Sequence, residues 1–264
     1  MRKFLLGGVA FVVLAMAPAS AADMPAVYKA APAAVTLHSW TGFYLGANAG
    51  YSWTRTGIDY RQAPGAVGNF GAPFDASGLS APFETTPRGF IGGGQIGYNH
   101  QMGAVVVGVE ADFAWRKATG TTGRTFATFG DQLTFNTEQK WVGTVRGRLG
   151  WTPANAWLVY ATGGLAYGKV SDQFSQAVVA PPGFAGSRSI SSDSSKLGWT
   201  LGAGTEYAFS RAWSLGLEYL YIKLGSQSLS LPAQTINKVT YAATNADFNH
   251  SSHALRVKLN YHPN

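Results

Sequence analysis

The sequence predicts an all-β fold, an eight-stranded antiparallel up-and-down transmembrane β-barrel. Apolar residues alternate with small or polar ones in eight segments, no apolar run of about 18 residues occurs beyond the N-terminal segment, and the connections alternate between short and long. Composition agrees, because charged residues make up 12% of the chain, about half the usual share in soluble proteins. Aromatic residues (13%) and 33 glycines suit strands with one face in lipid.

The N-terminal segment has the pattern of a signal peptide. Met1–Lys3 is basic, Phe4–Ala17 is apolar, and small residues follow at Ala19, Ser20 and Ala21. The apolar run is shorter than the roughly 20 residues of a spanning helix, which argues against a membrane anchor. We therefore predict a signal peptide over residues 1–21, cleaved after Ala21.

The mature chain is predicted to be one domain with a short lead. Residues 22–39 are rich in Ala and Pro and have no period, which indicates a periplasmic lead, and residues 40–264 form the barrel. The chain has no cysteine, which excludes lipoprotein acylation, disulfides and cysteine-ligated metal. Its formal charge of +7 falls to +5 without Arg2 and Lys3. With no basic cluster, we expect lipid headgroups and lipopolysaccharide as partners, and no nucleic acid.

The first strand is predicted from Phe43 to Trp53, where odd positions are apolar and even positions are mostly small or polar. The same alternation predicts seven more strands, at about 90–99, 105–115, 141–151, 157–168, 197–207, 213–225 and 253–261. Eight strands make the smallest common closed barrel.

The connections between these strands predict the orientation of the barrel. Short links are expected at about 101–104, 152–156 and 209–212, and long ones at about 54–89, 116–140, 169–196 and 226–252. Short periplasmic turns and long extracellular loops have this arrangement. An even number of strands then places both termini in the periplasm.

Six stretches carry a resemblance to a known family. They are Ser20–Pro25, Trp40–Tyr51, Ile91–Asn99, Tyr160–Gly168, Gly198–Ala208 and Trp213–Tyr219. Through them the chain resembles the alphaproteobacterial outer-membrane barrels that include the 25- and 31-kilodalton surface antigens. The resemblance implies an abundant, surface-exposed protein of the cell outer membrane that contributes to envelope integrity and host contact, with peptidoglycan or a host surface as further partners.

The C-terminus departs from that family. Its members usually end in Asn-Tyr-x-Phe, whereas here Asn260-Tyr261-His262 is followed by Pro263 and Asn264. The resemblance implies that barrel-assembly machinery reads a terminal aromatic residue. Because Tyr261 is in phase with the apolar residues before it, we expect it to serve as this signal.

The inward face is predicted to carry balanced charges. Four acids and four bases share it: Glu110, Asp112, Glu206, Glu218, Arg146, Arg148, Arg256 and Lys258. Isolated buried charges are costly, so equal numbers predict pairing. The small diameter favours a filled, salt-bridged interior, and a selective pore lined by the same residues is the alternative.

Other motifs suggest chemistry only weakly. Gly92-x-Gly94-x-x-Gly97 has dinucleotide-site spacing but lies inside a predicted strand, which favours close packing of the sheet. His250 and His253 suggest metal binding or esterase chemistry as hypotheses, yet no third metal ligand is evident in the sequence. We therefore expect no enzyme activity, metal or cofactor, and we attribute the eight tryptophans to interfacial girdles.

Two functional alternatives remain open at this point. The chain is either a structural surface protein, as preferred, or a narrow porin or haem-binding surface protein. The predicted loops are rich in Gly, Ser, Thr and Pro and show no obvious ligand set. Neither conduction nor the oligomeric state follows from the sequence.

Overall fold

The computed structural model describes residues 38–63, 80–126, 131–178, 186–236 and 239–263. The predicted signal peptide (1–21), its cleavage at Ala21 and most of the predicted lead (22–37) lie outside the described residues. No helix in the described ranges is long and apolar enough to span a membrane.

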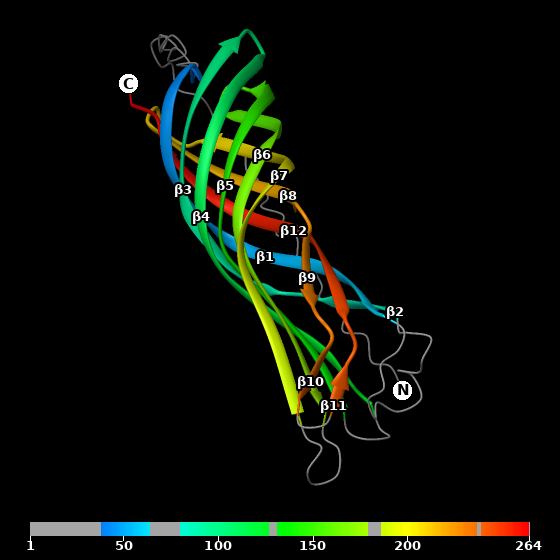
Figure 1. The fold of residues 1–264 in the computed structure, drawn as a ribbon. Coiled ribbons are helices and arrows are strands. Elements are labelled where there is room, and N and C mark those ends of the chain that lie inside the picture. The colour runs from blue at the N-terminus through cyan, green and yellow to red at the C-terminus, as the bar shows by residue number, and fades with distance from the viewer. Residues whose placement is uncertain (1–37, 64–79, 127–130, 179–185, 237–238, 264) are drawn as a thin grey trace, which may run out of the picture. The chain divides into compact units, whose positions relative to one another are not determined.

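A ring of eight antiparallel strands forms the barrel, which confirms the predicted fold class (Figure 1). The strands in ring order are β1 (Gly42–Gln62), β3 (Arg88–Met102), β4 (Val105–Phe126), β5 (Asp131–Ala154), β6 (Trp157–Val178), β7 (Gly186–Ala208), β8 (Trp213–Leu224) and β12 (Thr244–Tyr261). Pairing of β1 with β12, from Leu45 opposite Tyr261 to Gln62 opposite Thr244, closes the ring. Closure leaves no unpaired edge for lipid to meet.

The turn between β3 and β4 is one of the predicted short connections and has only two residues. It consists of Gly103 and Ala104, and Gly103 has a φ of +63°, in the left-handed region that glycine enters without steric cost. Such short turns mark the periplasmic end of the barrel.

The outer face of the barrel is an apolar band between two aromatic girdles. Leu45, Val109 and Leu165 are more than half exposed, as lipid-facing residues of a membrane barrel must be. The periplasmic girdle includes Trp151, Trp157, Tyr207, Trp213 and Tyr261, and the extracellular girdle includes Trp53, Trp115, Trp141, Tyr167, Trp199 and Tyr221. Rings within a girdle pack together, with centroids 5.1 Å apart for Trp213 and Tyr261 and 5.5 Å for Trp141 and Tyr167.

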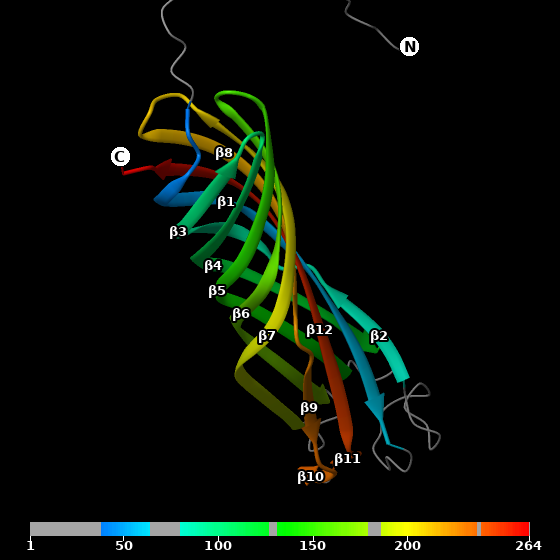
Figure 2. The ribbon, with the colours of Figure 1, turned by 90° about the horizontal axis from the view of Figure 1, so that it is seen from above.

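The long extracellular connections were predicted as loops, and this prediction is wrong over much of their length. Strands β1, β4, β5, β6, β7 and β12 extend into the predicted loop stretches 54–89, 116–140, 169–196 and 226–252 (Figure 2). Four short strands add to them: β2 (Ser80–Thr85) pairs with β1, β9 (Gln227–Leu231) pairs with β12, and β10 (Gln234–Ile236) pairs with β11 (Val239–Tyr241).

The physical reason is a reversal of the apolar alternation above the membrane. Within the membrane the apolar residues of β1 face outward, but beyond Trp53 the buried residues include Ile58 and Tyr60, and the outward ones include Arg55 and Asp59. Water replaces lipid outside the strand, so the apolar side chains turn inward.

An apolar core fills the extracellular part of the barrel. Phe135 of β5, Phe174 of β6 and Phe248 of β12 are at most 1% exposed and pack with Ile58 and Tyr60. The rings of Phe135 and Phe174 stack with centroids 5.0 Å apart. Burial of this size makes the extracellular part a packed structure, with an interior like that of a soluble domain.

Candidate functional site: the charged interior

All eight charged residues predicted to face inward are buried in the barrel. Their exposed fractions lie between 0% and 6%. They come from five strands: β4 carries Glu110 and Asp112, β5 carries Arg146 and Arg148, β7 carries Glu206, β8 carries Glu218, and β12 carries Arg256 and Lys258. Each occupies the phase opposite to the lipid-facing side chains of its strand, because successive side chains of a strand point to opposite faces.

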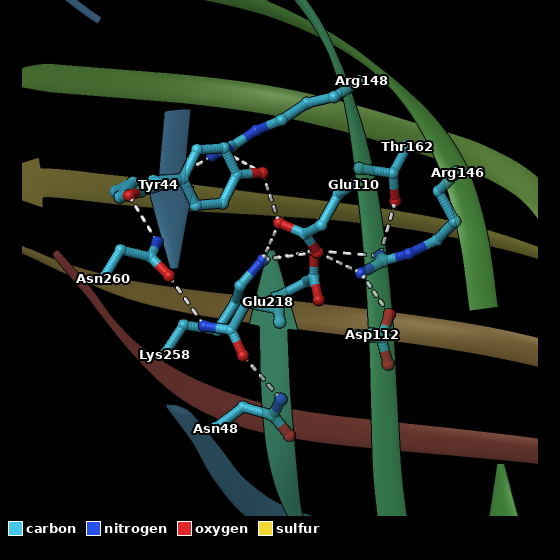
Figure 3. Close-up of polar contacts among 12 residues, drawn as sticks. Tyr44, Asn48, Glu110, Asp112, Arg146, Arg148, Thr162, Glu218, Lys258 and Asn260 are labelled. Carbon is cyan, nitrogen blue, oxygen red and sulfur yellow. Dashed lines mark hydrogen bonds and ion pairs between the residues drawn. The ribbon is translucent and has the colours of Figure 1, made fainter. Parts of the chain in front are cut away.

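Arg146 contacts three of these carboxylates (Figure 3). Its Nη2 donates to Glu110 and, over 2.9 Å, to Oδ2 of Asp112, while its Nη1 donates to Oε1 of Glu218 at 3.1 Å. Nη1 also donates to Thr162 at 3.1 Å. One guanidinium thus bonds carboxylates of two strands that are not neighbours in the ring, β4 and β8.

Two further cations complete the central cluster. Arg256 bonds Oδ1 of Asp112 at 2.9 Å and Oε2 of Glu218 at 2.7 Å. Lys258 donates to Oε2 of Glu110 at 2.6 Å and lies 3.6 Å from Oε1 of Glu218. Three cations therefore share three carboxylates, and every cation contacts at least two of them, so the buried charges balance within the cluster.

A second pair lies nearer the periplasmic end. Arg148 bonds Glu206, and Asn260 donates to Oε1 of Glu206 at 2.7 Å. Tyr44 connects the two groups, because its hydroxyl donates to Oε2 of Glu110 at 2.7 Å and accepts from Nη1 of Arg148 at 3.3 Å. The guanidinium of Arg148 also lies 3.7 Å from the centre of the Tyr160 ring, in cation–π geometry.

Sequence reasoning missed several neutral members of this site. Tyr44, Tyr160 and Asn260 all contact the charged residues, and Asn48 and Gln95 continue the network. Asn48 donates to Gln95, and Gln95 donates to Asn260, each over 2.7 Å. Their inward phase was a signal in the sequence that could have identified them.

The periplasmic opening is filled by aromatic side chains. Trp40 is fully buried, with ring centroids 4.7 Å from His38 and 5.9 Å from His262. The prediction that Trp40 belongs to an interfacial girdle is therefore wrong, since the residue precedes β1 and turns into the barrel. Burial lowers the pKa of His38 below its ordinary value, and the neighbouring His262 lowers it further.

The interior is also filled on the extracellular side of the charges. An apolar layer that includes Ile91, Val142, Leu220 and Ala254 follows the central cluster. Thus the described interior alternates between polar and apolar layers, and large side chains occupy each of them.

The two histidines of β12 do not form a joint site. His250 is buried, with Nε2 3.0 Å from Oδ2 of Asp172 and Nδ1 3.2 Å from Thr56. His253 faces outward and stacks on Trp53, with centroids 5.7 Å apart and planes inclined by 8°. An odd spacing along a strand places the two side chains on opposite faces, so one ion cannot bind both. Among the described residues no group of three His, Cys, Asp or Glu could hold a metal.

The glycine motif also has a packing role. A Cβ built at Gly97 would lie 2.4 Å from the ring of Tyr44, whereas one at Gly92 would meet only a backbone oxygen at 3.6 Å. Gly97 faces the interior, and Gly94 faces outward. The motif therefore lies in the wall of the barrel and allows Tyr44 to reach Glu110.

Replacing Gly97 by alanine is expected to destabilise the barrel by about 1–3 kcal/mol, because the new methyl group overlaps the Tyr44 ring. Urea unfolding in detergent, followed by tryptophan fluorescence, measures the change. Gly92→Ala is the matched control, and it should stay within about 0.5 kcal/mol of the unsubstituted protein. Equal losses in the two variants would show that packing against Tyr44 is not the cause.

Comparison with known proteins agrees with the barrel fold. Residues 9–262 match the family model described as outer membrane protein beta-barrel domain. The chain belongs to this family. It is an outer-membrane protein.

Two curated relatives of this outer-membrane barrel are outer-membrane proteins as well. It is 37% identical over 270 residues to the 31 kDa outer-membrane immunogenic protein of Brucella melitensis, with 99% of each chain covered. It is 30% identical over 206 residues to the 22 kDa outer membrane protein of Rhizobium leguminosarum, covering 76% of this chain and 72% of the relative. These matches confirm the family resemblance inferred from the sequence and the outer-membrane location.

Among solved structures, the attachment invasion locus protein of Yersinia pestis in complex with sucrose octasulfate is 14% identical, with a TM-score of 0.32. The match covers 82% of this chain and 99% of that one. At this TM-score the similarity carries no argument about function.

Proposed function

We propose that the protein is a non-enzymatic, non-conducting outer-membrane barrel that stabilises the envelope and presents a packed extracellular surface to the environment or a host. The observation that carries the proposal is the filled interior. Three cations and three carboxylates pair with one another across the barrel, and Trp40 and an apolar layer lie on either side of them. Side chains engaged with one another in this way support a structural role, because they offer neither a free base nor a free nucleophile.

Planar bilayer recordings test the filled interior. We expect no steady conductance from the purified protein, because ions would have to break several buried ion pairs to pass. Stable openings on the nanosiemens scale would instead favour the narrow porin. Recordings in a sodium salt and in a tetramethylammonium salt should both show no steady current. This comparison separates a closed barrel from an open one that is blocked by one kind of ion.

The proposed envelope role is tested in cells. A deletion strain should be more sensitive to detergent and release more vesicles. Expression of the intact gene should restore normal envelope behaviour. Normal envelope behaviour would remove this part of the proposal. One relative is named an immunogenic protein, which supports surface presentation here. Binding of antibodies raised against the folded protein to intact cells would test that presentation.

Among the described residues, no observation favours the haem-binding alternative. His250 contacts Asp172 and Thr56 inside the barrel, and His253 on the outer face stacks on Trp53 and meets the ring of Tyr221 edge-on. A haem titration followed by absorbance is the direct test, and an unchanged spectrum at excess haem is the expected result.

A further inference from the structure

Basic residues lie in a ring just beyond the extracellular aromatic girdle. Each is one or two positions from an aromatic residue of its own strand and on the outer side: Arg55, Arg88, Lys117, Lys140, Lys169 and Lys223. At the opposite rim, the described ranges hold a single Lys or Arg, Arg211. The cations therefore gather where the polar headgroups of the outer leaflet meet the barrel.

Four strands form a hollow in this ring. Its volume is about 610 Å³, and it is lined by residues of β1, β3, β4 and β5. Phe90 and Trp115 contribute apolar surface and are 79% and 66% exposed. Lys117 and Lys140 contribute charge, and Ala49, Gly50 and Gly92 leave space because their side chains are small. Apolar walls beside two lysines suit a ligand that has both an acyl chain and an anionic head.

Irregularities in two strands place the lysines at the hollow. The pairing of β4 with β5 shifts register between Trp115 and Ala118, and that of β5 with β6 shifts between Gln139 and Trp141. The two bulges thus fall at Lys117 and Lys140. Bulges re-aim side chains and are frequent beside functional sites.

The charge at the hollow is positive. Lys117 makes no ion pair with any described residue, and Lys140 contacts Asp193 at 3.0 Å, a carboxylate that Lys169 also approaches at 3.5 Å. Glu138 is the one acid that lines the hollow. Arg116, also in the lining, is 6% exposed and bonds Gln139 and Ser252, yet its Nε and Nη2 have no partner among the described residues. Its buried charge has no carboxylate partner and adds to that of the lysines.

We propose that this hollow binds a phosphorylated, multiply acylated glycolipid of the outer leaflet, of the lipid A class. The amines of Lys117 and Lys140 bind its phosphate oxygens, and an acyl chain lies between Phe90 and Trp115 over Gly92. The site lies on the outer wall, so it is independent of whether the interior conducts, and a failure of either proposal leaves the other standing.

Native mass spectrometry of the full barrel in detergent micelles, titrated with bisphosphorylated lipid A, tests the site. We expect the Lys117→Gln, Lys140→Gln double variant to bind about 30-fold more weakly, since each lysine near a membrane surface contributes about fivefold. The matched control is Lys223→Gln, a lysine of the same ring that does not line the hollow, and it should keep the affinity of the unsubstituted protein. Equal affinity of the double variant and the unsubstituted protein overturns the proposal.

A second pair of variants tests the shape of the hollow without changing its charge. Gly92→Leu fills the hollow and should weaken binding, whereas Gly94→Leu, on the same face of β3 but outside the hollow, should not.

Two further probes identify the ligand. Dephosphorylated lipid A and phosphatidylglycerol should bind weakly to every variant. If either binds the unsubstituted protein as tightly as bisphosphorylated lipid A, or if millimolar inorganic phosphate alone displaces that lipid, the assignment is wrong.

Discussion

Replacing Arg146 by methionine is expected to lower the free energy of unfolding by about 3–5 kcal/mol, because removing one partner leaves buried charges uncompensated. Arg146 is 1% exposed and bonds Glu110, Asp112 and Glu218. Without it, three carboxylates of the central cluster share two cations. Methionine is similar in length to arginine and keeps most of the packing, so the loss of stability reports on the missing charge.

Urea unfolding in lipid vesicles, followed by tryptophan fluorescence, measures this change. Arg55→Met is the matched control, because Arg55 also pairs with a carboxylate, Glu84 at 3.0 Å, but both side chains are at least half exposed. Arg55→Met should lower the free energy of unfolding by less than about 1 kcal/mol. Adding Glu110→Gln to Arg146→Met restores the balance of charge and should recover part of the stability. A double variant that is less stable than Arg146→Met would contradict charge compensation as the cause.

Replacing Phe135 by alanine is expected to destabilise the extracellular part of the barrel by about 3–5 kcal/mol, the usual cost of a cavity left by a buried phenylalanine. Phe135 is fully buried, stacks on Phe174 at 5.0 Å, and lies 4.9 Å from Phe83 and 6.1 Å from Tyr60. Phe248 of β12 lies 6.2 Å away as well, so five strands, β1, β2, β5, β6 and β12, meet at this side chain.

Hydrogen exchange locates the effect. Amides of β5 and β6 above the membrane should exchange faster by about two orders of magnitude or more, while those within the lipid band should keep their protection, because the apolar core lies outside the membrane. Phe209→Ala is the matched control, since Phe209 is 55% exposed in the turn between β7 and β8. Unchanged exchange in Phe135→Ala would mean that the extracellular strands do not depend on this core.

The sequence predicted the membrane-spanning part well because two solvents act on each strand there. Lipid outside and a polar interior require apolar and polar side chains at alternate positions. The faces of Val109 and Glu110 could therefore be assigned from the sequence without any knowledge of the fold. Above the membrane, water is on the outside and the interior is apolar. The alternation around Ile58 and Tyr60 is as regular, but there the apolar residues face inward. A search for strands with apolar, lipid-facing residues therefore does not identify this stretch as a strand.

Tyr261 and Trp40 lie near the two ends of the described barrel chain. The resemblance implied an assembly signal at Tyr261, which faces outward at 38% exposure and packs on Trp213 at 5.1 Å. Its role in assembly stays a prediction. Trp40 could not be placed from the sequence, because an indole at a membrane boundary and one inside a barrel mouth have the same local pattern.

What the sequence determined by itself is which side chains share the interior, because a strand fixes the face of every residue through its period of two. What only the tertiary structure decided is which of them meet. Arg146 of β5 bonds Glu218 of β8, three strands away in the ring, and Tyr44 joins the Arg148 pair to the central cluster. Those contacts depend on the stagger of the closed ring and on the lengths of side chains that cross it, and neither is encoded in the alternation of a single strand.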